Sequence, residues 1–107
     1  MKAVRVKEAK VQSEIVKTLR LLGYLVIHIP NQATHGVRRY SGLMTGAPDL
    51  IVLGDNKIWF LEVKTIDGKQ SRAQSIVQKL IEDRGFSYNI VRSVEDALKV
   101  VVYGEGQ

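Results

Sequence analysis

Two acidic residues and one lysine fall on neighbouring segments that have the pattern of β-strands. Asp49 begins the first segment, Asp49 to Leu53, and Glu62 and Lys64 end the second, Ile58 to Lys64. Side chains alternate across a strand, so Glu62 and Lys64 share one face of the second segment. The rest of that face is apolar. Charges that close an apolar strand face are candidates for chemistry on an anionic substrate.

The turn between the two segments predicts how they pair. Gly54 to Lys57 has the composition of a tight hairpin. With its two central residues in the turn, the ladder continues until Asp49 lies opposite Glu62. Opposed side chains have Cβ atoms about 4.5–5.5 Å apart, and two like charges there destabilise a sheet. A divalent cation between the carboxylates removes that penalty.

Alternatively, Asp49 caps a turn after Pro48 and Glu62 pairs with Lys64 on the surface. A one-residue slip of the register would separate the two acids.

Apolar periodicity and capping signals predict the elements that must position these side chains. They are a helix over about Val4 to Leu22, a strand over Tyr24 to Ile29, the two strands above, a helix from a Ser71 cap to about Arg84, a strand over Tyr88 to Val91 and a helix from Ser93 to about Tyr103. The order α-β-β-β-α-β-α predicts an α/β fold with a mixed sheet flanked by helices. Two loops, Asn31 to Ala47 and Thr65 to Gln70, interrupt this order. We expect residues 1–107 to form a single domain.

Composition restricts the function classes. The 16 basic and 11 acidic residues give a net charge of +5, which favours an anionic partner and nucleic acid first. There is no cysteine, so disulfides and cysteine-based zinc sites are excluded. No apolar run approaches membrane-spanning length, and we expect no membrane partner and a cytoplasmic location.

The spacing of the charged residues resembles a known nuclease signature. Pro48-Asp49, twelve residues, and then Glu62-Val63-Lys64 is similar to the PD-(D/E)xK pattern of restriction-endonuclease-like nucleases. More of the chain resembles the virus-type replication-repair nuclease (VRR-NUC) domain within that superfamily. The additional matching features are Glu14, Ile29-Pro30-Asn31, Gly46-Ala47-Pro48-Asp49-Leu50 and Ser71-Arg72-Ala73-Gln74. The resemblance covers about Val11 to Tyr103.

The resemblance implies a Mg²⁺ or Mn²⁺ site. Asp49 and Glu62 would be its carboxylate ligands, together with the main-chain carbonyl of Val63. Glu14 would reach the metal from the first helix, directly or through water. These ions prefer carboxylate, carbonyl and water oxygens, so the implied ligands suit them. A solvated position on the flank of the helix is the plainer explanation of Glu14.

Two further residues receive catalytic roles from the same resemblance. Lys64 would orient or activate the attacking water and stabilise charge on the phosphate. Gln74 would support Lys64 or the scissile phosphate. Gln74 also has a purely structural explanation, because it is the third residue after Ser71 and completes a capping box.

Basic residues outside the motif are candidate DNA contacts. Arg38 and Arg39 lie in the first long loop and suit phosphate binding, although a solvated loop explains them as well. Lys69 and Arg72 flank the start of the second helix, where main-chain N–H groups also favour phosphate.

The expected activity is therefore that of a metal-dependent DNA endonuclease. Stand-alone members of the family are typical of phages and resemble junction-resolving enzymes, which implies a homodimer acting on Holliday or other branched DNA in a phage-infected or bacterial cell. An exonuclease or flap nuclease on the same core remains open. A non-catalytic nucleic-acid-binding module and a metal-independent dimerisation domain are further alternatives.

Overall fold

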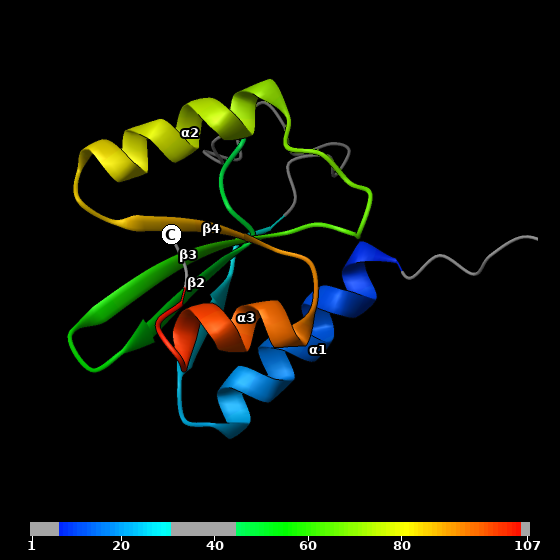
Figure 1. The fold of residues 1–107 in the computed structure, drawn as a ribbon, viewed down its shortest axis with the longest axis vertical. Coiled ribbons are helices and arrows are strands. Elements are labelled where there is room, and N and C mark those ends of the chain that lie inside the picture. The colour runs from blue at the N-terminus through cyan, green and yellow to red at the C-terminus, as the bar shows by residue number, and fades with distance from the viewer. Residues whose placement is uncertain (1–6, 31–44, 106–107) are drawn as a thin grey trace, which may run out of the picture.

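The computed structural model describes residues 7–30 and 45–105 of the chain (Figure 1). Its elements are α1 (Glu8–Leu21), β1 (Leu25–His28), β2 (Leu50–Gly54), β3 (Lys57–Val63), α2 (Arg72–Asp83), β4 (Ser87–Val91) and α3 (Val94–Val101). Their order is the one predicted. The predicted loop over Asn31 to Ala47 lies mostly outside the described residues.

The four strands form one mixed sheet in the order β1-β2-β3-β4. β1 pairs with β2 and β2 with β3 in antiparallel fashion, whereas β4 runs parallel to β3 after the α2 crossover. The β2–β3 hairpin closes at the pair Gly54 and Lys57, with Asn56 in the left-handed region at φ 61°. The predicted parallel strand is confirmed, and so is the predicted hairpin register as far as Leu50 and Leu61, where the ladder ends before the predicted pair of Asp49 with Glu62.

The main core lies between one face of the sheet and the helices α1 and α3. Figure 1 shows these two helices side by side on that face, with α2 across the other. Alternation along the strands sends Leu61 and Val63 of β3 into this core, against the α1 stripe of Val11, Ile15 and Leu19. The opposite alternation turns Glu62 toward the α2 side.

Helix ends differ slightly from the prediction. Lys7 has an extended backbone, so α1 begins at Glu8, whereas the predicted start near Val4 lies outside the described residues. At the other end, the N–H groups of Gly23 and Tyr24 donate to the carbonyls of Arg20 and Leu19, a Schellman stop. Gly85 and Phe86 end α2 in the same way. Within the described segments, no helix combines the length and apolarity needed to cross a bilayer.

Candidate active site

Asp49 lies at the end of β2 that faces away from the hairpin turn. The strand ladder stops one pair earlier, at Leu50 and Leu61. Beyond it, the Asp49 carboxylate replaces the main chain: its Oδ2 accepts the Val63 N–H at 2.7 Å. Its own carbonyl accepts the Ile29 N–H at 2.8 Å. Asp49 is therefore held between β1 and β3, with its carboxylate at the end of β3.

Glu62 is fully buried, and its two carboxylate oxygens have different surroundings. Oε1 accepts a hydrogen bond from the Tyr88 hydroxyl of β4. Oε2 lies 3.2 Å from Lys64 Nζ, an ion pair with a side chain that is 15% exposed. Among the described residues no hydrogen bond reaches Oε2, although it is completely shielded from solvent. A buried carboxylate oxygen without a directed partner is costly, so this atom has spare capacity for a cation.

The surroundings of three carboxyl groups at this site favour the protonated, neutral form over the charged form. Burial raises the pKa of Asp49 above its ordinary value. Burial, followed more weakly by the Asp49 charge, also raises the pKa of Glu62. The pKa of Glu8 is raised by burial first and then by Asp49 and Glu62. Three acids with raised pKa values in one place are characteristic of a functional site.

A pocket of about 260 Å³ opens beside these residues. Its walls come from the start of α1, the end of β1, the segment before β2, the end of β3 and the start of α2. The lining residues are Glu8, Ile29, Pro30, Gly46, Ala47, Pro48, Asp49, Lys64, Ser71 and Gln74. Glu62 is not part of the lining, because Lys64 and Tyr88 cover its carboxylate. The pocket therefore presents the carboxylates of Glu8 and Asp49 and the side chain of Lys64 directly, whereas Glu62 lies outside its lining.

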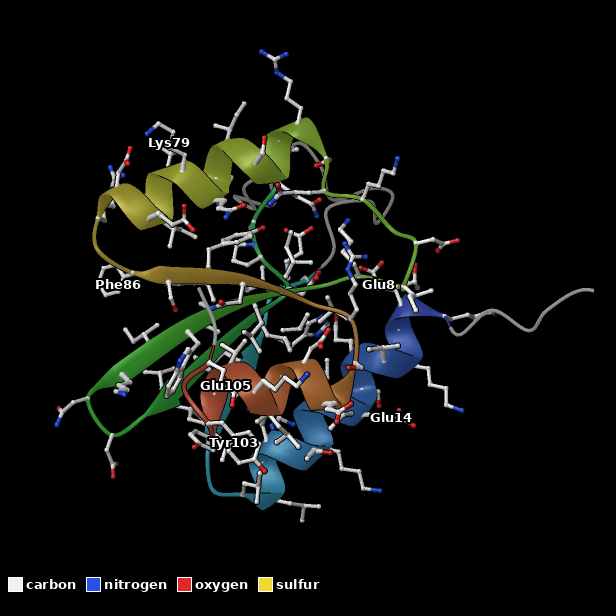
Figure 2. All side chains as sticks on the ribbon, in the orientation of Figure 1. Glu8, Glu14, Lys79, Phe86, Tyr103 and Glu105 are labelled. Carbon is white, nitrogen blue, oxygen red and sulfur yellow. The ribbon has the colours of Figure 1, made fainter. Side chains whose placement is uncertain are left out.

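The acid that α1 brings to the pocket is Glu8, and the role of Glu14 at the metal, directly or through water, stays a prediction. Both side chains are exposed, but Glu8 lines the pocket and Glu14 is not among its lining residues; Glu14 lies farther along α1 (Figure 2). Six residues along a helix correspond to about 9 Å of rise and a turn of about 240°, so the two side chains leave α1 at different heights and on different sides. Because only the N-terminal end of α1 reaches the pocket, it is the first acid of the helix that meets Asp49.

Gln74 has both of its predicted roles available. Its Oε1 accepts the Ser71 N–H at 2.8 Å, and its own N–H donates to Ser71 Oγ at 3.1 Å, so the capping box is complete. The same side chain lines the pocket. Since the cap uses the amide oxygen, the amide nitrogen remains as a hydrogen-bond donor.

The structure describes two of the four predicted DNA-contact residues. Lys69 and Arg72 are exposed at the start of α2, outside the pocket lining. Arg38 and Arg39 lie outside the described residues.

Two site neighbours were missed from the sequence. Tyr88 contacts Glu62, and this follows from the parallel register, which pairs Phe60 with Tyr88 and puts Tyr88 on the face of Glu62. Arg92 follows β4, and its Nη1 donates to the carbonyls of Thr65 and Gly68 at 2.6 and 2.7 Å. It thereby holds the loop that leads from Lys64 to α2. Neither residue carries a local sequence signal, because both contacts depend on the pairing of distant strands.

The donor set fits a hard divalent cation. No three His, Cys, Asp or Glu side chains within residues 7–30 and 45–105 are close enough to hold a metal by themselves. Mg²⁺, however, commonly binds through one or two carboxylates and keeps water or substrate oxygens as its other ligands. Asp49 and Oε2 of Glu62, which now faces the Lys64 ammonium, supply such a pair, and a cation there would favour the ionised form of both.

Comparison with solved structures places the fold. A structure described as a VRR_NUC domain has 28% sequence identity and a TM-score of 0.69, with 90% of this chain and 95% of that chain covered. A second, described as a VRR_NUC domain protein, has 17% identity and a TM-score of 0.75, with 92% and 88% covered. At that lower identity the likeness concerns the fold alone. No protein-family model and no curated protein matches the chain.

The chain thus has the restriction-endonuclease-like α/β fold that the sequence predicted, with a nuclease-type domain. More narrowly, its fold is that of solved VRR-NUC domains, which supports the resemblance seen in its motifs.

The raised pKa of Asp49 leads to a stability prediction for metal-free protein. In EDTA, Asp49→Asn is expected to increase the free energy of unfolding at about pH 8, and the gain should shrink as the pH falls toward about 4. The folded protein binds the Asp49 proton more tightly than the unfolded chain does. Ionisation therefore destabilises the fold above the ordinary carboxyl pKa of about 4, and fully so above the folded pKa.

Urea unfolding across this pH range measures the difference, since asparagine can still accept the Val63 N–H but carries no charge. Asp55→Asn, in the exposed hairpin turn, is the control and should show no such trend. A stability gain that does not vary with pH would contradict the prediction.

Proposed function

We propose that the protein is a Mg²⁺- or Mn²⁺-dependent DNA endonuclease that cuts branched DNA, with Holliday junctions as the first candidate. The observation that carries the metal-dependent part is the pair of carboxylates Asp49 and Glu62, with one buried oxygen left without a hydrogen bond beside Lys64. A binding module has no need of two neighbouring acids whose pKa values are raised by burial. The nuclease-type fold supports the same conclusion. The choice of branched DNA rests on the resemblance to junction-resolving members of the family.

Each residue of the site has a role in phosphodiester hydrolysis. Asp49 and Glu62, with the main-chain carbonyl of Val63, would hold the cation, which supplies Lewis acidity and activation of water. Lys64 orients the attacking water and offsets charge on the phosphate, because its ammonium borders the pocket. The Gln74 amide is a donor for a phosphate oxygen.

Glu8 takes the place that the sequence assigned to Glu14. It lines the pocket and interacts electrostatically with Asp49, so it is suited to hold a water of the cation's outer shell. Lys69 and Arg72 provide exposed positive charge at the start of α2 for the flanking backbone.

We also propose that the working unit is a homodimer, since two-fold symmetry would set two active sites on opposing strands of a junction. An apolar band supports a partner of this kind. Leu25 of β1, Leu53 of β2 and Ile58 of β3 share one sheet face, and Leu25 is 58% exposed.

The test is a substrate panel of labelled four-way junction, flap, single-stranded and linear duplex DNA, each with Mg²⁺, Mn²⁺ or EDTA. We expect symmetric nicks in the junction with either metal and none in EDTA. Asp49→Ala should abolish cleavage. Glu8→Gln should slow it, whereas Glu14→Gln, on the same helix but away from the pocket, should match the wild type.

The other outcomes separate the alternatives. Cleavage that persists in EDTA or in Asp49→Ala contradicts the metal mechanism. A single nick near a flap favours a flap nuclease. DNA binding without cleavage of any substrate favours the binding module. A monomer by light scattering, in the presence of junction, contradicts the homodimer.

A further inference from the structure

The carboxylate of Glu62 meets two different neighbours, and only one of them belongs to the proposed catalytic set. Lys64 contacts Oε2, and the Tyr88 hydroxyl donates to Oε1. Tyr88 is 1% exposed and Glu62 is 0% exposed, so no bulk water competes for either oxygen. The orientation of the carboxylate is therefore decided by these two side chains.

Tyr88 is itself held from several directions. Its backbone lies in β4, where it pairs with Phe60 in the parallel ladder. Its hydroxyl also interacts with the side chain of Gln70. Gln70 in turn donates to Gln78 Oε1 of α2 at 2.8 Å, and Gln78 continues to Glu82 at 3.0 Å. A hydroxyl anchored by a strand on one side and by a side-chain network on the other has one preferred direction for its proton.

A purely structural role does not account for this arrangement. A buried carboxylate kept for stability needs partners for both oxygens, and apolar packing would commonly be at least as stable. Here Oε1 receives the hydrogen bond of the Tyr88 hydroxyl, whereas Oε2 faces the Lys64 ammonium at 3.2 Å, a side chain that the proposed mechanism assigns to the substrate. The asymmetry makes sense if the second oxygen is kept for an additional ligand.

We propose that Tyr88 is a positioning residue that occupies Oε1 of Glu62 and so reserves Oε2 for the divalent cation. This inference rests on the proposed function, because it assumes that Glu62 is a metal ligand. Tyr88 acts through Glu62 and touches neither metal nor DNA. Partners of metal ligands act in this way: they fix the orientation of the ligand, and their loss typically weakens metal affinity about 10- to 100-fold.

Tyr88→Phe tests the proposal, because it removes the hydroxyl and keeps the ring. We expect Mn²⁺ affinity, measured by calorimetry on EDTA-treated protein, to fall about 10-fold or more. The metal concentration for half-maximal junction cleavage should rise by the same factor, and saturating Mn²⁺ should restore the maximal rate. Tyr103→Phe, at an exposed tyrosine after α3, is the control and should leave both values unchanged.

An unchanged Mn²⁺ affinity in Tyr88→Phe overturns the proposal. So does a lower rate at every metal concentration with unchanged affinity, which is what a merely structural role predicts. If circular dichroism shows that Tyr88→Phe does not fold, Gln70→Met provides the second test: it removes the donor to the hydroxyl from a half-buried loop residue, and an unchanged affinity there overturns the idea. Wild-type protein that neither binds Mn²⁺ nor cleaves would instead overturn the proposed function.

Discussion

Lys64→Met is expected to reduce junction cleavage by about 10²- to 10⁴-fold while strengthening Mn²⁺ binding. The loss of rate follows because the ammonium is the only basic side chain in the pocket wall formed by the described residues. The gain in affinity follows because Lys64 Nζ lies 3.2 Å from Glu62 Oε2, the atom assigned to the cation. Removing a positive charge at that distance removes a competitor and an electrostatic repulsion.

The two readouts must move in opposite directions for this explanation to hold. Single-turnover nicking at saturating Mn²⁺ gives the rate, and calorimetry gives the affinity. Lys57→Met, in the exposed hairpin turn, is the matched control and should change neither. If Lys64→Met weakens Mn²⁺ binding together with the rate, Lys64 acts by holding the carboxylates in place and not on the substrate.

Gly46→Ala is expected to destabilise the protein by at least about 2 kcal/mol and to impair cleavage. Gly46 has φ +88°, and a Cβ there would lie 2.5 Å from the main-chain carbon and oxygen of Ala73. Those atoms belong to the first turn of α2, so neither can move aside without shifting the helix. Asp49 lies three residues after Gly46, and Gln74 directly follows Ala73; both line the pocket.

A second glycine separates the effect of the positive φ from the effect of the clash with α2. Gly85 has nearly the same conformation, φ +90°, but a Cβ there would meet nothing within 4 Å. Gly85→Ala therefore isolates the backbone strain, about 1 to 2 kcal/mol, from the clash with α2. Urea unfolding should show the larger loss for Gly46→Ala, and only that variant should lose cleavage at temperatures where both remain folded. Equal losses would show that the approach to α2 contributes nothing.

The site was predictable from the sequence as far as local signals extend. The hairpin between β2 and β3 has a two-residue turn, so counting along its arms was enough to put Asp49 near Glu62 and Lys64 beside it. Ser71 and Gln74 form a capping box because the spacing of that motif is local. The resemblance to VRR-NUC domains came from these same residues.

The missing parts depend on long-range geometry. Tyr88 reaches Glu62 through the parallel register of β4 on β3, which nothing in the sequence of either strand specifies. Glu8 lines the same pocket as Asp49 because the N-terminal end of α1 is directed at it, and the position of a helix end relative to a distant strand has no local sequence signal. Glu14 was assigned from the resemblance alone, and no local pattern could test where its side chain would lie.

The contacts by which Arg92 holds the loop after Lys64 do not depend on the protonation of the site carboxylates. Its guanidinium donates hydrogen bonds to the main-chain carbonyls of Thr65, Ile66 and Gly68. Carbonyl oxygens do not titrate in the accessible range, and arginine keeps its charge throughout it. Acidification that protonates Asp49 and Glu62 should therefore leave this fastening intact. The acid limb of a pH–rate profile would then report the carboxylates, without a contribution from loosening of the loop that carries Lys64 toward α2.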